Sequence, residues 1–379
     1  MNLRHPTGWM ATCACALLAT AACHDVSATD VVLAPPDCND AGFTAALTTV
    51  DASGSGTLTF DCGTATIAIA SYKQIANAVT IDGGGTITLD GGGTSPFLQV
   101  FFSANVTLRG LTFQHGMFGD VHPLESFGTL MLDHVRVLDN VSDGSAVANY
   151  GTLTVRSSTF SNNANTRTDF NGDGGAIVNS SGTLDVADST FDGNSSGRYG
   201  GAVFSDLSMT VLNSTFDGNT AFGGAALYQT GSGTSFVEFT TIIDNIGTAF
   251  GGGVYNEGSA SATLTLSRSV LIDNAGGNCD GVLTSSGYNL WHGTTQCPFN
   301  ADGDAAATDA TFGALADNGG PTLTRLPGTG NSAIDHVPSN LCQVTADQRG
   351  VPRPFGTGCD SGAVEVAEDP DVVFTNGFD

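Results

Sequence analysis

A short acidic stretch has the spacing of a metal-binding loop. Oxygen-bearing side chains stand at alternate positions before a glycine, in the order Asp169, Asn171 and Asp173. Calcium loops begin in this way because carboxylate and amide oxygens are the ligands that Ca²⁺ prefers. Ser180 occupies the position at which an EF-hand needs a bidentate glutamate, so an EF-hand is excluded. Two interpretations stay open: a calcium site completed by backbone carbonyls, and an ordinary solvated turn.

Histidines and arginines supply the other reactive groups. His115, His122 and His134 lie close together in the sequence, where they either converge on one site or stand as separate surface residues. A polysaccharide lyase needs a base and a cation that neutralises a uronate carboxyl, and a glycoside hydrolase needs two suitably separated carboxyls. The arginines between residues 109 and 198 are not accompanied by lysine or by acidic residues at recurring positions. We therefore assign no catalytic residue from the sequence.

A repeated motif must position these groups. A large apolar residue is followed three positions later by an asparagine, and these asparagines are Asn140, Asn163, Asn194, Asn219, Asn245 and Asn274. Glycine-rich marks stand between them, at 174–177, 200–203, 223–226 and 251–254, with a weaker version at 144–147. Successive asparagines are about 23 to 31 residues apart, which is the length of one supersecondary unit of a solenoid.

Each repeat contains a short alternating run, such as Thr152–Val155, that indicates a strand with one buried face. No repeat contains a window with helical spacing. The pattern predicts an all-β fold, a right-handed parallel β-helix of the pectate-lyase-like kind, in which the apolar residue of the motif points into a narrow core. We expect the asparagines to stack at the following bend, where a left-handed backbone suits asparagine and the side chains hydrogen-bond to one another and to buried backbone groups.

One short helix is expected near the N-terminal end of the coils. Phe43, Leu47 and Val50 share a face over residues 40–50. A helix in this place would cover the open end of the stack, as the end caps of solenoid proteins do.

The repeats resemble those of polymorphic outer-membrane proteins and related secreted bacterial β-helix proteins. The resemblance rests on the Phe-x-x-Asn and Gly-Gly-Ala-(Ile/Val) pairs over residues 137–274, and it extends to first coils at 79–85 and 106–113. Towards the C-terminus, four stretches of the chain resemble the choice-of-anchor (type Q) segment of bacterial surface proteins: 315–322, 333–335, 347–354 and 359–365. The resemblance implies a surface-attached or secreted bacterial protein and names no substrate.

The first residues are typical of an export signal. Arg4 precedes an apolar run from Trp9 to Ala22 that is too short for a membrane span. Cys23 follows Thr-Ala-Ala, which is similar to a bacterial lipobox except that threonine stands where leucine is usual. Lipidation of Cys23, which would anchor the protein to a membrane, and simple cleavage with release both stay open.

The remaining cysteines form pairs that are close in sequence. After Cys13, Cys15 and Cys23 are set aside, the pairs are Cys38 with Cys62, Cys279 with Cys297, and Cys342 with Cys359. Such pairs favour disulfides in an oxidising compartment, although spacing alone does not fix the connectivity. None of these cysteines has the CxxC spacing of a zinc or redox site.

The charge of the chain excludes one class of partner. The sequence has 37 acidic and 11 basic residues, for a net charge of −26, and Lys73 is its only lysine. Because binding to phosphates needs clusters of lysine and arginine, nucleic acid is not an expected partner.

These observations predict the organisation of the chain. We expect a signal peptide (1–22), an N-terminal cap region (23–77), β-helix coils (78–300), a choice-of-anchor-like segment (301–366) and a C-terminal tail (367–379). The expected function is non-catalytic adhesion or binding of an extracellular polysaccharide or cell-surface glycan, with calcium as the one cofactor suggested.

Two other functions stay open, a polysaccharide lyase or glycoside hydrolase and a passive envelope spacer. Aromatic residues clustered on an exposed strand face would favour glycan binding. An arginine with two or three carboxylates in a groove would favour a lyase.

Overall fold

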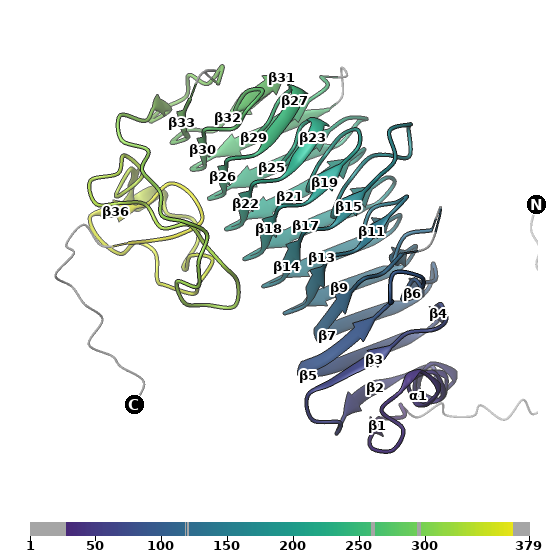
Figure 1. Ribbon diagram of the computed structural model, residues 1–379. Helices are drawn as coiled ribbons and strands as arrows, with labels where there is room; N and C mark the ends of the chain where they lie inside the picture. The colour runs from purple at the N-terminus through teal and green to yellow at the C-terminus, as the bar shows by residue number, and fades with distance from the viewer. Residues whose placement is uncertain (1–27, 118, 120, 259–261, 294–296, 367–379) are drawn as a thin grey trace, which may run out of the picture.

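Short strands wind into a parallel β-helix with one helix at its N-terminal end (Figure 1). The computed structural model describes residues 28–117, 119, 121–258, 262–293 and 297–366. The expected signal peptide and Cys23 lie outside these residues. Within the described part, no helix is long and apolar enough to cross a membrane. The all-β, right-handed parallel β-helix predicted from the repeats is confirmed.

The N-terminal helix covers the first coil. It is α1 (Asp40–Ala52), and the Asn39 side chain caps it by accepting a hydrogen bond from the Gly42 N–H at 3.1 Å. Phe43, Leu47 and Val50 are buried, as their shared face predicts. The parallel pairing already begins with β1 (Val31–Leu33), which pairs with β2 (Ser55–Phe60). Parallel pairing therefore begins inside the region 23–77, which is expected to be the N-terminal cap.

The strands of successive coils stack in four rows, which we number in chain order within a coil. Rows one and two belong to one 20-stranded sheet and are continuous in β5 (Ala78–Asp90) and β7 (Asn105–Gln114). Besides β1 and β2, row one contains β9 (Thr129–Asp133), β13 (Thr152–Arg156), β17 (Thr183–Ala187), β21 (Met209–Leu212), β25 (Thr234–Glu238), β29 (Thr263–Ser267) and β32 (Thr284–Ser285). Row two contains β3 (Ala65–Ala68), β10 (Arg136–Leu138), β14 (Thr159–Ser161), β18 (Thr190–Asp192), β22 (Thr215–Asp217), β26 (Thr241–Ile243), β30 (Val270–Ile272), β33 (Leu290–His292) and β34 (Ala305–Ala306).

The other two rows are separate sheets. The five-stranded sheet is row three, with β11 (Val141–Ser142), β15 (Ala164–Asn165), β19 (Ser195–Ser196), β23 (Thr220–Gly223) and β27 (Ile246–Phe250). The nine-stranded sheet is row four, with β4 (Lys73–Ile75), β6 (Leu98–Val100), β8 (Leu124–Ser126), β12 (Val147–Asn149), β16 (Ile177–Asn179), β20 (Val203–Ser205), β24 (Leu227–Gln229), β28 (Val254–Asn256) and β31 (Cys279–Gly281).

Parallel pairing in register places equivalent residues of successive coils directly above one another. Phe160 pairs with Phe191 and Phe191 with Phe216 in row two. Their buried rings stack with centroids 4.7 Å apart and almost parallel planes, which is the spacing of neighbouring strands. The apolar residue of the repeat therefore forms a continuous column in the core.

The asparagine of the repeat forms a second buried column at the end of row two. From Asn140 to Asn274, each side-chain amide donates to the carbonyl oxygen of the next asparagine at 2.8–2.9 Å. The same oxygen also accepts the backbone N–H of the preceding asparagine, for example from Asn194 to Asn219 at 2.9 Å. Asn278, which lies outside the repeat pattern, adds one further step at 2.8 Å. The column satisfies backbone groups that the bend would otherwise leave unpaired.

The left-handed residue at this bend is not the asparagine itself, contrary to expectation. Positive φ angles occur one position earlier in the motif, at Asp139, Asn162, Gly193, Gly218, Asp244 and Asp273. Asp, Asn and Gly are the residues that adopt this conformation at least cost. The bend thus comes just before the column, and the following asparagine points its side chain inwards.

The glycine-rich marks lie just before row four. Gly200 has a φ of +67°, and a Cβ on the next residue, Gly201, would lie 2.5 Å from the Thr220 carbonyl oxygen of the following coil. In the next coil, Leu227 pairs with Val203, so Gly224 is the equivalent of Gly200. The glycine-rich mark at 223–226 therefore begins one residue too early, because the residues equivalent to 200–203 are 224–227.

Three disulfides join the pairs that are close in sequence: Cys38 with Cys62, Cys279 with Cys297, and Cys342 with Cys359. The first ties the residues before α1 to the end of β2. The second disulfide holds β31, the last strand of row four. The third joins β36 (Gly358–Cys359) to the residue after the short 3-10 helix η1 (Ser339–Leu341), and β36 pairs with β35 (Val337–Pro338) in a two-stranded sheet.

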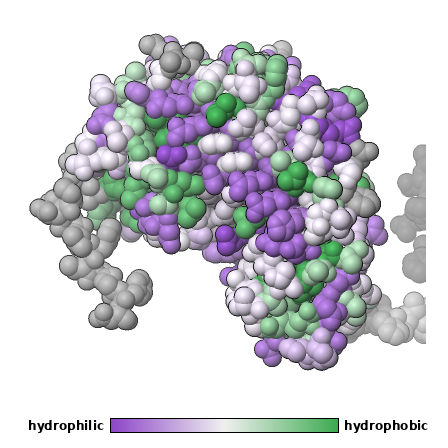
Figure 2. Space-filling model, viewed as in Figure 1, coloured by the Kyte–Doolittle hydropathy of each residue, from purple (hydrophilic) through white to green (hydrophobic). Residues whose placement is uncertain are grey.

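The C-terminal segment packs on the outer side of row two and leaves the N-terminal coils uncovered (Figure 1). It bonds to a column of threonines: Thr215 donates to the Gln348 side chain at 2.7 Å, and the Ala363 N–H donates to Thr241 at 2.9 Å. Within the segment, Arg353 and Glu365 form a fully buried ion pair at 2.8 Å. The coil surface visible in Figure 2 is a mixture of hydrophilic areas and small hydrophobic ones.

Arg325 fastens the segment to the coils through Asp217. Its guanidinium makes two bonds to the Asp217 carboxylate, at 2.7 and 2.8 Å, and a third to Asp244 at 2.9 Å. Asp217 is buried, with 4% of its surface exposed. The repeat pattern predicts an exposed residue here, and this prediction is wrong because the C-terminal segment covers the position.

We predict a rank order of stability for the repeat motif. Asn194→Ala should cost about 1–3 kcal/mol because it leaves buried backbone groups unpaired. Phe191→Ala should cost about 3–5 kcal/mol because it empties part of a thin core. Asp192→Ala, on the outer side of the same strand, should change stability by at most about 0.5 kcal/mol. Chemical denaturation of the three variants measures the order, and a loss at Asp192 equal to that at Phe191 would contradict the assigned faces.

A second prediction concerns the attachment of the C-terminal segment. Asp217→Ala should cost about 1–3 kcal/mol, because it removes the principal partner of a partly buried guanidinium. Limited proteolysis should then release fragments from 301–366 sooner than in the wild-type protein. Asp192→Ala, at the equivalent position one coil earlier, is the control and should leave the cleavage rate unchanged.

Candidate functional site

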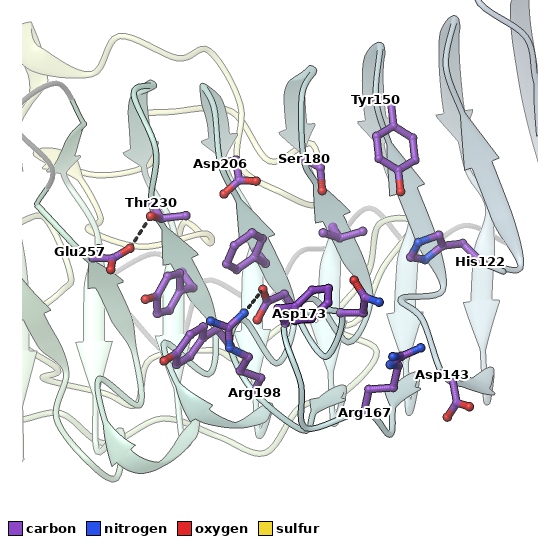
Figure 3. Close-up of a pocket in the computed structure, with 16 residues that line it drawn as sticks. His122, Asp143, Tyr150, Arg167, Asp173, Ser180, Arg198, Asp206, Thr230 and Glu257 are labelled. Carbon is purple, nitrogen blue, oxygen red and sulfur yellow. Dashed lines mark hydrogen bonds and ion pairs between the residues drawn. The ribbon is translucent and has the colours of Figure 1, made fainter. Parts of the chain in front are cut away.

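A groove runs along the outer face of row four. It has a volume of about 470 Å³, within the range of small-molecule sites. The residue that follows each row-four strand forms one edge, which we call the upper rim: Tyr150, Ser180, Asp206, Thr230 and Glu257 (Figure 3). The connections from row three to row four form the opposite edge, the lower rim: Asp143, Arg167, Asp173, Arg198 and Tyr199.

The groove forms at a coil where two outward columns of side chains both lack an aromatic ring. The central residues of consecutive row-four strands are in register, and Phe204 and Tyr228 stack 5.4 Å apart over the coils that follow the gap. On the upper rim, Tyr150 ends a stack, with Phe127 4.9 Å behind it. In the column of Phe204, the preceding coil has the small Val178. In the column of Tyr150, the following coil has the small Ser180. Because no large ring continues either stack at this coil, a hollow remains between Tyr150 and Phe204.

The acidic stretch singled out in the sequence forms part of the lower rim. Asp169 makes two bonds to the Arg167 guanidinium, at 2.6 and 2.9 Å, and Asp173 bonds to Arg198 at 2.9 Å. Asn171 lines the groove beside them. Both carboxylates thus have arginine partners, and within the described residues no cluster of three or more His, Cys, Asp or Glu side chains has the arrangement of a metal site. Calcium binding at Asp169, Asn171 and Asp173 stays a prediction.

Asp173 is the most perturbed carboxyl of the groove. It is 8% exposed, and its Oδ1 atom is buried without a hydrogen-bond partner. Burial raises the pKa of Asp173 to about 7, although the Arg198 guanidinium acts in the opposite direction and the charge of Asp206 adds to the rise. The desolvation of the carboxylate therefore outweighs one ion pair, and Asp173 changes its protonation state near neutral pH.

The three histidines do not converge. His122 lines the groove and contacts the Ser145 carbonyl oxygen through Nδ1 at 3.1 Å, and burial lowers its pKa. His115 lies beside Asp90 at 3.2 Å, and His134 beside Asp133 at 2.7 Å. The last two occupy exposed bends on other sides of the coil, so the separate-residue interpretation holds for them.

Sequence reasoning missed most of the groove. The sequence places no acidic residues at recurring positions beside the arginines, yet the structure brings Arg167 to Asp169 and Arg198 to Asp173. The aromatic column was also missed, although its signal is visible: Phe204 comes directly after Gly-Gly-Ala-Val, and Tyr255 after Gly-Gly-Gly-Val. The residue after each of these two marks faces outwards in row four.

We predict that Asp173 titrates near pH 7 rather than near its ordinary pKa of 3.8. Carboxyl-carbon NMR measures the midpoint. Arg198→Ala should raise it further, because the guanidinium favours the charged form, whereas Arg167→Ala, which removes the partner of Asp169, should leave it unchanged. Since the folded state holds this proton more tightly than the unfolded chain, Asp173 contributes less stability as the pH rises from about 4 to 7. A midpoint at the ordinary value would contradict the buried environment.

Comparisons with known proteins support the repeat assignment. Residues 188–206 match the Chlamydia polymorphic membrane protein repeat, and they contain Asn194 and the glycine-rich mark at 200–203. No curated protein sequence matches the chain. Among solved structures, an arginine-to-alanine mutant of the PL6 family alginate lyase AlyGC is similar over 92% of this chain, with 13% identity and a TM-score of 0.24. This chain covers 60% of the length of that lyase. One coil of the β-helix thus carries a repeat of the Chlamydia membrane-protein type.

Proposed function

We propose that this protein binds a glycan in the row-four groove and does not cleave it. One observation carries the proposal: the hollow between Tyr150 and Phe204 is bordered by polar side chains on both rims. A sugar ring has apolar C–H faces that pack on aromatic groups and hydroxyls that both donate and accept hydrogen bonds. The groove offers partners for each of these features.

The rims supply hydrogen-bonding groups of both kinds. Arg167 and Arg198 donate only, the carboxylates of Asp173 and Asp206 accept, and the hydroxyls of Ser180 and Tyr150 do both. Because coils repeat at the strand spacing of about 4.8 Å, these groups recur at intervals comparable to the advance of a pyranose unit in an extended polysaccharide. A chain that lies along the groove would therefore meet a polar rim side chain at each coil.

A glycoside hydrolase is the second candidate, and one observation favours it. Asp173 has the raised pKa that a general acid needs, and Asp206 is a second carboxyl in the same groove. Against this role, Arg198 holds one oxygen of Asp173 and the other is buried. A lyase for acidic polysaccharides is disfavoured, because the carboxylates of the two rims outnumber the guanidiniums and would repel a uronate.

The cellular setting belongs to the proposal as well. We infer that the protein is exported and acts at a bacterial cell surface, either held by a lipid on Cys23 or released. The resemblance to Chlamydia membrane-protein repeats and the three disulfides support an oxidising location outside the cytoplasm. In this setting, a rigid β-helix that binds glycans would serve adhesion, and a passive spacer would need no groove.

Variants on either side of the gap test glycan binding. Tyr150→Ala removes one wall, and Ser180→Tyr fills the gap by continuing the stack, so each should weaken binding about tenfold, which corresponds to one aromatic contact. Affinity electrophoresis against neutral, acidic and amino polysaccharides measures the change. New reducing ends in the same incubations, lost in Asp173→Asn, would instead support the hydrolase.

Two variants on the row-one face serve as controls. Phe236→Ala removes an exposed ring, and Thr210→Tyr adds one. Neither should change glycan binding. If the controls weaken binding as much as Tyr150→Ala and Ser180→Tyr do, the groove is not the binding site.

A further inference from the structure

The upper rim carries two carboxylates that have no cationic partner within the described part of the chain. Asp206 and Glu257 stand in the same column, with Thr230 between them, and the Thr230 hydroxyl donates to Glu257 (Figure 3). No lysine or arginine of the described residues pairs with either. By contrast, Asp169 and Asp173 of the acidic stretch each have an arginine.

These carboxylates influence one another. Burial raises the pKa of Asp206 and the charge of Glu257 raises it further, while Asp206 in turn contributes to the raised pKa of Asp173. The interactions are therefore repulsive and only partly screened by solvent. A cation placed among the three groups would relieve this repulsion.

Two further observations point to a bound group rather than to an incidental acidic patch. Asp173 is 92% buried, and its Oδ1 atom has no hydrogen-bond donor, whereas buried acceptors are nearly always paired. Tyr228, on the floor beside Glu257, is packed 4.4 Å from the Tyr199 ring. Aromatic rings beside carboxylates form a favourable environment for an organic ammonium group.

We infer that the groove selects glycans with free amino groups, namely amino-sugar polymers that lack their N-acetyl groups. The inference rests on the proposed glycan binding. An ammonium group lies between Asp206 and Glu257, where its three N–H donors match the two carboxylates and the Thr230 hydroxyl. N-acetylation abolishes the charge, and an acidic sugar is repelled.

The experiment compares three oligosaccharides of equal length by titration calorimetry with the full chain: a glucosamine oligomer, its fully N-acetylated form and a neutral glucose oligomer. The glucosamine oligomer should bind about tenfold more tightly or better, because a hydrogen bond between charged groups is worth about 1.5–3 kcal/mol. Asp206→Asn and Glu257→Gln should each weaken binding of the glucosamine oligomer far more than binding of the neutral oligomer, and so remove most of this preference.

The control is Asp185→Asn, which removes one charge on the row-one face. It should leave the preference intact, and a loss equal to that of Asp206→Asn would show general attraction to an acidic protein and overturn the inference. Equal binding of all three oligomers, unchanged in the rim variants, would also overturn it while leaving the proposed glycan binding in place. If none of the three oligomers and none of the polysaccharides binds, the proposed function itself fails.

Discussion

Register between coils is the constraint on which the rest of the structure depends. A parallel strand that pairs in register places each side chain over its equivalent in the previous coil, at the strand spacing of about 4.8 Å. Every position of the coil thus becomes a column. A column of buried polar side chains is tolerable only if every one of them has hydrogen-bond partners. The asparagines from Asn140 to Asn278 meet this condition by donating to one another and to the backbone. A second polar column supports the bend between rows one and two, where the Ser158 and Ser189 N–H groups donate to the serine hydroxyls of the following coils.

The outward columns are used for attachment. The threonines that begin the row-two strands alternate with the core phenylalanines, so their hydroxyls point away from the core and receive the C-terminal segment. Gln348 bonds to Thr215 and Thr190 of two neighbouring coils. Asp217 supplies the charged contact, and the buried pair of Arg353 and Glu365 holds the segment together. Because this segment covers row two, the groove on row four stays free.

The groove arises where an outward column changes its residue type. Rings stack up to Tyr150 on the upper rim and from Phe204 onwards on the floor, and the small Val178 and Ser180 lie between the two stacks. A hollow of this origin is rigid, because the strands on both sides of it are fixed by the same hydrogen bonds as the core. Its charge is uneven, since the arginines of the groove, Arg167 and Arg198, both lie on the lower rim. Shape and charge together therefore favour a ring-shaped ligand with donors and a positive group.

The sequence by itself determined the coil. The interval between asparagines and the alternation in runs such as Thr152–Val155 predict the β-helix, and the apolar face of residues 40–50 predicts its capping helix. The local cysteine pairs favour its disulfides. All of these are properties of residues that are close in the sequence. The tertiary structure decided what each outward residue does. Asp192 and Asp217 stand at equivalent positions, yet Asp217 is buried because a distant segment brings Arg325 to it. Arg198 and Asp173 are 25 residues apart and meet only because consecutive coils lie one strand spacing apart. A repeat pattern records which way a side chain faces, whereas the partner that it meets depends on how coils and segments far apart in the chain are packed.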